Sequence, residues 1–304
     1  MFHTYHKALV VAGLVFCSLS SVFAYSGGLG TAGDPYQIAT KADLLALAGA
    51  IADYNECFIL TADIDMEKLV FMTTIIAADT SSTDDFQGTA FTGTFDGNSH
   101  KITNFTINCG SNDYIGIFGK IDSSGSVKNL GLENCAISGD STSYYVGSLV
   151  GLNNGGSISD CYSMGTVSGN YAVGGLVGDN EGGSVGRSFW DTETSDQTTS
   201  AGGEGKTTAQ MKTLSTFTDA GWNFVSIWSI CEGTNYPRFL WQIPAADFVC
   251  PDGVYFEDLA YFFERWLMTD CGLSNDCDGT DMNTDGTVNF VDFGLFASNW
   301  LEDI

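Results

Sequence analysis

The chain has 304 residues and a formal net charge of −26 at pH 7, because 37 Asp and Glu residues outnumber 11 Lys and Arg residues. So negative a protein is a poor partner for nucleic acids and for anionic membrane surfaces. Hydrophobic residues make up 44% of the chain and aromatic residues 13%, which excludes a wholly disordered protein and predicts two or more folded units.

Residues 1–24 have the composition of a secretory signal peptide. Their apolar run, residues 8–19, is too short to span a bilayer. We expect cleavage after Ala24 and a secreted, extracellular or cell-surface protein with no membrane span. A lipoprotein signal at Cys17 is the alternative, although Phe16 stands where such a signal needs a small residue.

Residues 25–96 are predicted to form a capping and lead-in region. Thr40 and Asp43 have the spacing of a capping box. Apolar residues at helical spacing follow them, namely Leu44, Leu45, Leu47 and Ile51. We therefore predict a helix that caps the next region, followed by a strand over residues 57–66.

The middle of the chain, residues 97–190, repeats one pattern. Segments 115–135, 146–169 and 173–193 each begin with a short apolar and glycine-rich strand and continue into a turn. A Ser-Val or Ser-Ile step follows the turn in each segment, with a weaker match upstream; the apolar residues of these steps are Ile102, Val127, Ile158 and Val185. Repeats of 25–31 residues without a helical period are typical of a solenoid whose loops vary in length.

We therefore predict a mainly β fold, a right-handed parallel β-helix (β-solenoid). Apolar side chains of one coil would stack on their equivalents in the next, because a single coil cannot bury its apolar face. Glycines would serve corners with positive φ, and Asn residues would hydrogen-bond along the axis. An antiparallel β-sandwich is the alternative.

The repeated residues resemble the GLUG motif, which is named for a Gly-Leu-x-Gly step that occurs here as "GSLVG" and "GGLVG". The resemblance extends over about residues 86–242. It implies a secreted or surface protein of the kind that includes large adhesins. It supplies no catalytic residues.

Residues 191–245 are predicted to cap the far end of the solenoid. The segment 207–221 reads as a helix that ends before Gly221. Four aromatic residues would close the core, namely Trp222, Trp228, Tyr236 and Trp241. A row of exposed rings that stacks on sugars is the alternative.

A calcium loop is predicted at residues 281–292. Six residues stand at the ligand positions of such a loop: Asp281 at position 1, Asn283 at 3, Asp285 at 5, Thr287 at 7 through its carbonyl, Asn289 at 9 and Asp292 at 12. Gly286 at position 6 permits the sharp turn, and Ca²⁺ prefers this set of hard oxygen ligands.

A related segment lies 34 residues upstream, since Val254–Asp270 matches Val288–Ile304. The duplicated loop and helix resemble a type I dockerin over residues 246–304, which implies a calcium-dependent module that docks on a cohesin-like or cell-surface protein. Asp247 and Asp258 hold the first and last positions of the first loop, but Val249 and Pro251 stand at positions 3 and 5, where oxygen ligands belong. We expect a single strong calcium site and a degenerate first half.

Removal of the signal would leave eight cysteines, an even number that favours disulfides in an exported protein. We expect a bridge between Cys271 and Cys277. Cys109, Cys135 and Cys161 recur every 26 residues. They are either small buried residues of successive coils or partners in a bridge between coils.

The sequence offers few groups for catalysis. His100 would be the only histidine left after signal cleavage, and Asp63 and Asp65 would share one face of a strand as glycosidase acids do. Other candidates are the acids Asp191, Glu193 and Asp196 and the bases Lys101, Lys120, Lys128 and Arg187. We assign no catalytic residue and no organic cofactor.

The sequence as a whole predicts a secreted, non-catalytic repeat protein. Its solenoid would bind a polysaccharide or another surface ligand, and its C-terminal module would anchor it in the presence of Ca²⁺. The alternative is a polysaccharide-active enzyme, a lyase or a glycosidase, on the same β-helix.

Overall fold

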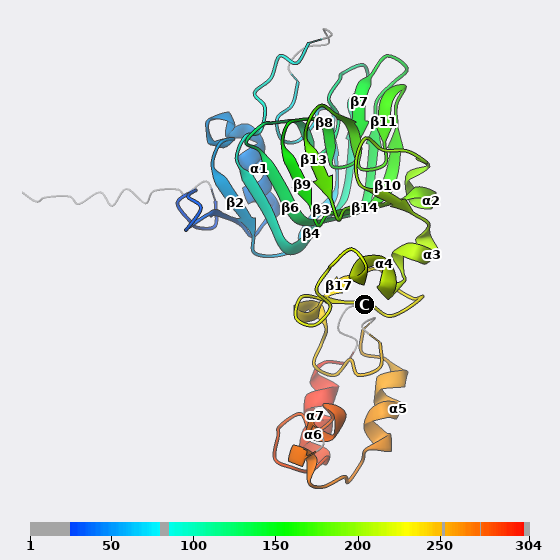
Figure 1. The fold of residues 1–304 in the computed structure, drawn as a ribbon. Coiled ribbons are helices and arrows are strands. Elements are labelled where there is room, and N and C mark those ends of the chain that lie inside the picture. Colours follow the sequence, from blue (N-terminus) through cyan, green and yellow to red (C-terminus); the bar gives the residue numbers. More distant parts are fainter. Residues whose placement is uncertain (1–24, 80–84, 251–252, 274, 301–304) are drawn as a thin grey trace, which may run out of the picture.

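The computed structural model describes residues 25–79, 85–250, 253–273 and 275–300. Parallel strands form a β-solenoid, and a smaller helical module lies beyond it at the C-terminal end of the chain (Figure 1). The predicted signal peptide and Cys17 lie outside the described residues. Among the described residues there is no helix long and apolar enough to cross a membrane.

The solenoid strands follow one another around successive coils. They are β1 (Tyr36–Ile38), β2 (Cys57–Leu60), β3 (Ile64–Phe71), β4 (Thr94–Asn108), β5 (Phe118–Asp122), β6 (Ser126–Ser138), β7 (Tyr144–Gly147), β8 (Val150–Asn154), β9 (Ser157–Ser159), β10 (Tyr162–Ser168), β11 (Tyr171–Gly174), β12 (Val177–Asn180), β13 (Ser184–Gly186), β14 (Phe189–Asp191) and β15 (Glu204–Lys206).

Strands of successive coils pair in parallel. The largest sheet has the path β1-β2-β4-β6-β10-β14-β15, while β5-β8-β12 and β7-β11 form smaller sheets on other sides of the coil. All pairings among these strands are parallel. The predicted β-solenoid is therefore confirmed and the antiparallel sandwich was the wrong alternative; the right-handed sense stays a prediction.

The predicted stack of apolar residues exists. Ile158 pairs with Val127 on one side and with Val185 on the other. Val127 and Ile158 are buried, but Val185 is only half-buried, because β13 pairs with β9 alone and ends this column. The assignment of Ile102 to the same column was wrong, since Phe95 pairs with Val127 and Ile102 pairs with Leu132.

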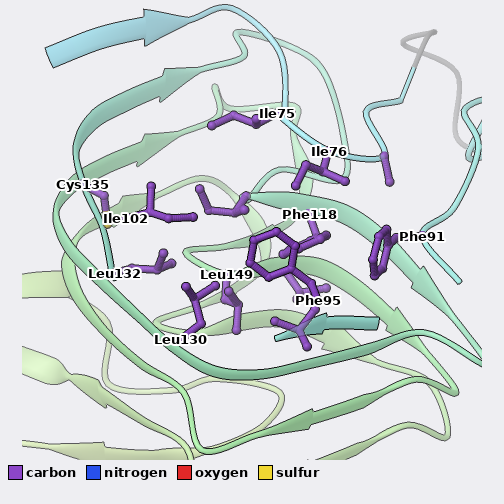
Figure 2. Close-up of a cluster of buried hydrophobic side chains, with 14 of the residues drawn as sticks. Ile75, Ile76, Phe91, Phe95, Ile102, Phe118, Leu130, Leu132, Cys135 and Leu149 are labelled. Carbon is purple, nitrogen blue, oxygen red and sulfur yellow. The ribbon is translucent and has the colours of Figure 1, made fainter. Parts of the chain in front are cut away.

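Aromatic side chains fill part of the solenoid core. Phe95 and Phe91 both pack on Phe118, at centroid distances of 5.5 and 5.1 Å. Figure 2 shows these rings in one cluster with Ile102 and Leu132, which pair with each other between the neighbouring strands β4 and β6. Full burial of a side chain of this size contributes about 1.5–3 kcal/mol, so this cluster is a main source of the solenoid's stability.

The glycines of the Gly-Leu-x-Gly steps are required by close backbone approach. A Cβ on Gly151 would lie 2.7 Å from the carbonyl oxygen of Gly119, and a Cβ on Gly178 would lie 2.6 Å from that of Gly151. Each coil can therefore rest on the one before it only because both positions lack a side chain.

The corners of the coil use fewer glycines than expected. Positive φ does occur at Gly155 and Gly182 in two equivalent turns, and Asn153 donates to Asn180 Oδ1 at 3.0 Å along the axis, as predicted. A second corner recurs within β4, within β6, between β9 and β10, and between β13 and β14. There the residue with positive φ is not glycine; it is Asn98, Asn129, Asp160 or Arg187, in that order. Asn and Asp tolerate this conformation because their side chains bond locally; Asn129, for example, donates to Asp96.

The caps match the prediction in part. Helix α1 (Lys41–Gly49) begins with the predicted capping box of Thr40 and Asp43, and η1 (Ile51–Asp53) follows it. The single helix predicted over 207–221 is two short ones, α3 (Thr208–Met211) and α4 (Leu214–Thr218). The remaining elements of this cap are α2 (Thr192–Ser195), the antiparallel pair β16 (Trp228–Ser229) and β17 (Arg238–Phe239), and η2 (Leu240–Gln242).

Three of the four cap aromatics lie in or against a second core. Trp222 and Trp228 are buried beside Phe217 and Phe239, and Tyr236 packs on the same cluster. Trp241 instead remains 57% exposed. The core-closing role predicted for these residues is therefore confirmed for three of them, and Trp241 is the exception.

The C-terminal module contains α5 (Phe256–Glu264), η3 (Cys271–Leu273), α6 (Asn275–Asp278) and α7 (Phe290–Ser298). Its own small core includes Val254, Val288, Phe262 and Phe296. Val254 and Val288 hold equivalent positions in the duplicated sequence, as do Phe262 and Phe296. The two halves thus bury the same residues against each other.

Two disulfides are present in the described part of the chain. The predicted bridge between Cys271 and Cys277 is one of them. The other joins Cys231 in the cap to Cys250 at the start of the C-terminal module, a pair that no pattern in the sequence had singled out. Cys109, Cys135 and Cys161 are buried thiols, so the alternative of bridges between coils was wrong.

Truncation of the stacked residues tests the column. Ile158→Ala should lower the free energy of unfolding by about 2–4 kcal/mol and Val127→Ala by about 1–3 kcal/mol, because both side chains are fully enclosed. Val185→Ala should cost less, because that side chain is half-buried. Urea unfolding of the three variants measures this order, and an equal cost at all three positions would contradict it.

The buried thiols make a second prediction. Burial raises the pKa of Cys109 to about 11 and the pKa values of Cys135 and Cys161 to about 12. At pH 8 these groups are therefore protonated as well as enclosed, and maleimide should label none of the three until the chain is unfolded. Mass spectrometry after labelling in denaturant without reductant should find all three modified; a missing pair would reveal a bridge.

Candidate functional site

The predicted calcium loop has a turn centred on Asp281. The carboxylate of this residue accepts the backbone N–H of Asp285 at 3.1 Å and that of Gly286 at 2.8 Å. Gly286 has a φ of +94°, which favours glycine, as the sequence predicted for position 6. The first ligand position therefore closes the loop by bonding across it.

The middle of the loop is held by side chains that bond to one another. Asp285 accepts the Asn283 amide at 2.8 Å, and its other oxygen accepts the Thr287 hydroxyl at 2.8 Å and the Thr287 N–H at 3.0 Å. These bonds lower the pKa of Asp285, the Asn283 amide most of all. Asn289 donates to the Thr287 carbonyl oxygen at 3.3 Å.

Asp292 joins the loop to the helix that follows. It is fully buried, and its two oxygens accept the N–H of Asn283 at 3.1 Å and the N–H of Asn289 at 2.9 Å. The second of these bonds is half of a capping box at the start of α7. A change in the loop is therefore transmitted directly to the first turn of that helix.

All six predicted ligand residues thus belong to one hydrogen-bonded loop. It offers three carboxylates, two amide oxygens and one backbone carbonyl, and every donor is a hard oxygen of the kind Ca²⁺ prefers. Across the described part of the chain there is no group of three or more His, Cys, Asp or Glu side chains placed to hold a metal ion. The donor set fits calcium, and calcium binding itself stays a prediction.

The first half of the module repeats this scaffold. Asp258 accepts the N–H of Val249 at 3.0 Å and that of Tyr255 at 3.0 Å, which are the counterparts of the Asp292 bonds. Asp247 accepts the N–H of Gly253 at 3.0 Å. Val249 contributes no side-chain oxygen. The first half therefore has the loop bonds without the full ligand set.

Two exposed phenylalanines are related by the same duplication. Phe256 and Phe290 are 75% and 79% exposed, each at position 10 of its loop. Phe256 lies edge-on to Trp300 at 5.4 Å, and Phe290 lies edge-on to Trp266 at 5.0 Å. Each half thus lays its phenylalanine against the tryptophan of the other half, and the module presents two similar aromatic sites.

The acids considered for catalysis are separated. Asp65 bonds to Asn104 and to the N–H of Glu67, and these bonds lower its pKa, the Glu67 N–H most of all. Asp63 lies outside the strand and accepts from His100 Nδ1 at 3.1 Å. The expectation that Asp63 and Asp65 share a strand face was therefore wrong.

The second acidic cluster has a structural role. Asp191 is fully buried, caps α2 through the N–H groups of Glu193 and Thr194, and accepts from the hydroxyls of Thr208 and Tyr236. Its oxygens are occupied in joining the last coil to the cap. Asp196 is the αL residue that ends α2.

A groove lies between the solenoid and the cap segment that carries β17, which runs below β4 in Figure 1. We call it the Trp241 groove. Two adjoining hollows of about 430 and 580 Å³ share Trp241 and Thr61. Their other lining residues include Asn98, His100, Asp63, Lys101, Arg238 and Gln242. The sequence placed Asp63, His100 and Trp241 in three separate contexts, and only the fold brings them together.

Comparison with known proteins agrees with the repeat pattern. Residues 142–168 match the model of the GLUG motif. These residues span most of one coil, from just before β7 to the end of β10. The GLUG resemblance seen in the sequence is confirmed for this coil.

Two curated relatives share part of the chain. Halomucin of Haloquadratum walsbyi is 34% identical over 147 residues, which are 47% of this chain and 2% of that protein. A protein of Evansella cellulosilytica named as a Gly-rich membrane protein is 38% identical over 104 residues, which are 32% of this chain and 12% of that protein. The chain therefore spans only a small part of either relative.

One solved structure is similar in outline. It is a Bacteroides ovatus protein named as an immunoglobulin A1 protease, and the match covers 72% of this chain and 96% of that chain. The identity is 19% and the TM-score is 0.36. That score is too low to support an argument about activity.

Asp285→Ala should abolish high-affinity calcium binding by the full chain, because it removes one of three carboxylates from the loop. Asp285 is exposed, so the loss should not come from a disrupted core. Glu257→Gln removes the same charge from an exposed position at the start of α5 and should bind calcium as the parent does. Isothermal titration measures both, and equal binding by all three proteins would show that the site is assigned wrongly.

Proposed function

We propose that this protein is an exported, non-catalytic binding protein, in which the solenoid presents a ligand-binding surface and the C-terminal module anchors the chain to a partner protein through calcium-dependent folding. The observation that carries the proposal is the duplicated loop and helix of residues 246–304. Its second loop has an oxygen-bearing residue or backbone carbonyl at each of the six predicted ligand positions, and both halves expose an aromatic residue at the same position.

The anchoring role rests on the coupling between loop and helix. The loop carries three carboxylates, and a bound cation would offset the repulsion among them. Because Asp292 both belongs to the loop and caps α7, metal binding would stabilise this helix and its contacts. The exposed rings of Phe256 and Phe290 would then be held ready for a dockerin-type contact with a cohesin-like or cell-surface protein.

An extracellular location agrees with several features. The GLUG match, the two disulfides and the named relatives, a halomucin and a Gly-rich membrane protein, fit a protein that works outside the cell. The N-terminal sequence supports export by a cleaved signal. The mature protein would then begin at Tyr25.

A polysaccharide-active enzyme receives no comparable support. The acid that lines the Trp241 groove is Asp63, and Glu133 pairs with the lining residue Lys101; both acids already accept hydrogen bonds from neighbouring side chains. A retaining or inverting glycosidase needs a pair of carboxyl groups on either side of the scissile bond. The bonds made by these two acids instead hold the strands and the cap together.

Affinity capture tests the anchoring role. The full chain, immobilised through Lys side chains, should retain a surface or secreted protein from its native source in the presence of calcium and release it with a chelator. Asp285→Ala and Phe290→Ser should both lose this partner, whereas Tyr171→Ser, which changes an exposed ring on the solenoid, should keep it. Capture that is indifferent to calcium, or that survives both of the first two changes, would refute the proposal.

A further inference from the structure

The Trp241 groove contains an aromatic ring that the fold holds in place but leaves uncovered. Trp241 is 57% exposed, although Phe239, two residues earlier in the chain, is buried in the core of the cap. His100 packs against it at a centroid distance of 4.5 Å, and Phe239 lies nearly parallel to it at 6.5 Å. An apolar ring fixed in this way offers a flat contact surface at little cost in side-chain entropy.

Polar groups around the ring are fixed as well. Asp63 is the centre of this set, because it accepts from His100, from the N–H of Lys101 and from the Gln242 amide. These bonds join a loop after β2, the strand β4 and the cap. The carboxylate is still about 29% exposed and faces the hollow beside Trp241.

A second layer positions the basic groups. Lys101 pairs with Glu133 at 2.9 Å, and the buried Tyr162 hydroxyl donates to the other oxygen of Glu133 at 2.6 Å. Burial raises the pKa of Tyr162 well above its ordinary value, so this hydroxyl remains a donor at all physiological pH values. Arg238 lines the same hollow from β17.

The charges of the groove differ from those of the chain as a whole. Asp63, Lys101 and Arg238 line it, and Lys101 is already paired with Glu133, so the lining has no excess of negative charge, whereas the whole chain carries −26. A field of that sign repels polyanions at long range. The groove therefore favours a ligand that is neutral, has one apolar face, and has several hydroxyl groups at its edges. A pyranose ring meets all three requirements.

We propose that the Trp241 groove binds a neutral oligosaccharide, with one pyranose ring stacked on Trp241 and its hydroxyls bonded to Asp63, Arg238 and Gln242. This inference rests on the binding role proposed for the solenoid and names its ligand class. The two adjoining hollows run along the junction of solenoid and cap, so a short chain of sugars fits them better than a single monosaccharide.

The test uses the full chain and defined hexasaccharides. Titration followed by tryptophan fluorescence and calorimetry would compare neutral gluco-, xylo-, manno- and galacto-configured hexaoses with hexagalacturonate as the anionic probe. At least one neutral hexaose should bind, and hexagalacturonate should not. Failure of every neutral hexaose at millimolar concentration, or tighter binding of the anionic one, would overturn the proposal.

Substitutions locate the site. Trp241→Ala should weaken binding by about tenfold or more, whereas Trp241→Phe should recover most of the affinity because it restores a ring. Tyr171→Ala removes another exposed ring, one that stacks on Tyr144 at 4.5 Å on a different side of the solenoid, and should bind as the parent does. Unchanged affinity of Trp241→Ala would place the ligand elsewhere and refute the assignment.

Further measurements on the same samples distinguish failure of this inference from failure of the proposed function. Chromatography of the hexaose after long incubation should show it intact; shorter products would refute the non-catalytic role while leaving the groove as a sugar site. Absence of sugar binding alongside calcium-dependent capture of a partner would refute the groove and leave the anchoring role standing.

Discussion

The structure depends on the in-register stacking of parallel strands. Parallel pairing places a residue of one coil directly beside its equivalent in the next, about 4.8 Å away. Every position in the coil must therefore suit its own neighbour above and below. Val127 beside Ile158, and Gly151 beside Gly178, are two consequences of this rule. The first pair fills the core, and the second makes room for the backbone.

The same rule explains how binding groups come to lie together. Lys101 lies in β4 and Glu133 in β6, and the two strands are neighbours in the sheet, so residues 32 positions apart in the chain form an ion pair. The cap segment then crosses this flank and adds Trp241. Because the strands and the cap are each held by their own core, the groove between them has fixed walls.

The C-terminal module follows a different principle. Its core is small, and its two loops are closed by carboxylates that accept backbone N–H groups. Small domains of this kind gain stability from a disulfide or a metal ion, and this one has the Cys271–Cys277 bridge in addition to its predicted calcium loop. The solenoid has a long core of its own, so an ion bound to the predicted loop would stabilise the module far more than the coils.

Local patterns in the sequence predicted much of the fold. The period and its irregular loops indicated a solenoid, because stacked coils tolerate insertions only at their turns. The capping box of Thr40 and Asp43 is local in sequence, and so was found correctly. The assignment of Ile102 failed because β4 turns a corner at Asn98 and Ser99, which adopt positive φ. Phe95 lies before this corner, opposite Val127, and Ile102 lies after it, opposite Leu132. The single helix expected over 207–221 failed because Lys212 and Thr213 leave the helical conformation, which the apolar pattern does not reveal.

The sequence by itself determined the repeat, the coil that matches the GLUG motif, the bridge between Cys271 and Cys277 and the order of oxygen-bearing residues in the predicted calcium loop. Each of these depends on residues close together in the chain or on a regular spacing. Only the tertiary structure decided that Asp63, His100 and Trp241 form one groove, that Cys231 pairs with Cys250, and that Cys109, Cys135 and Cys161 remain thiols. The groove and the Cys231–Cys250 bridge join segments whose separation in the chain follows no period, and they arise from where the cap crosses the coils. The three thiols recur every 26 residues, but that spacing suits buried thiols and bridges equally, so only their placement in the coils decides between the two.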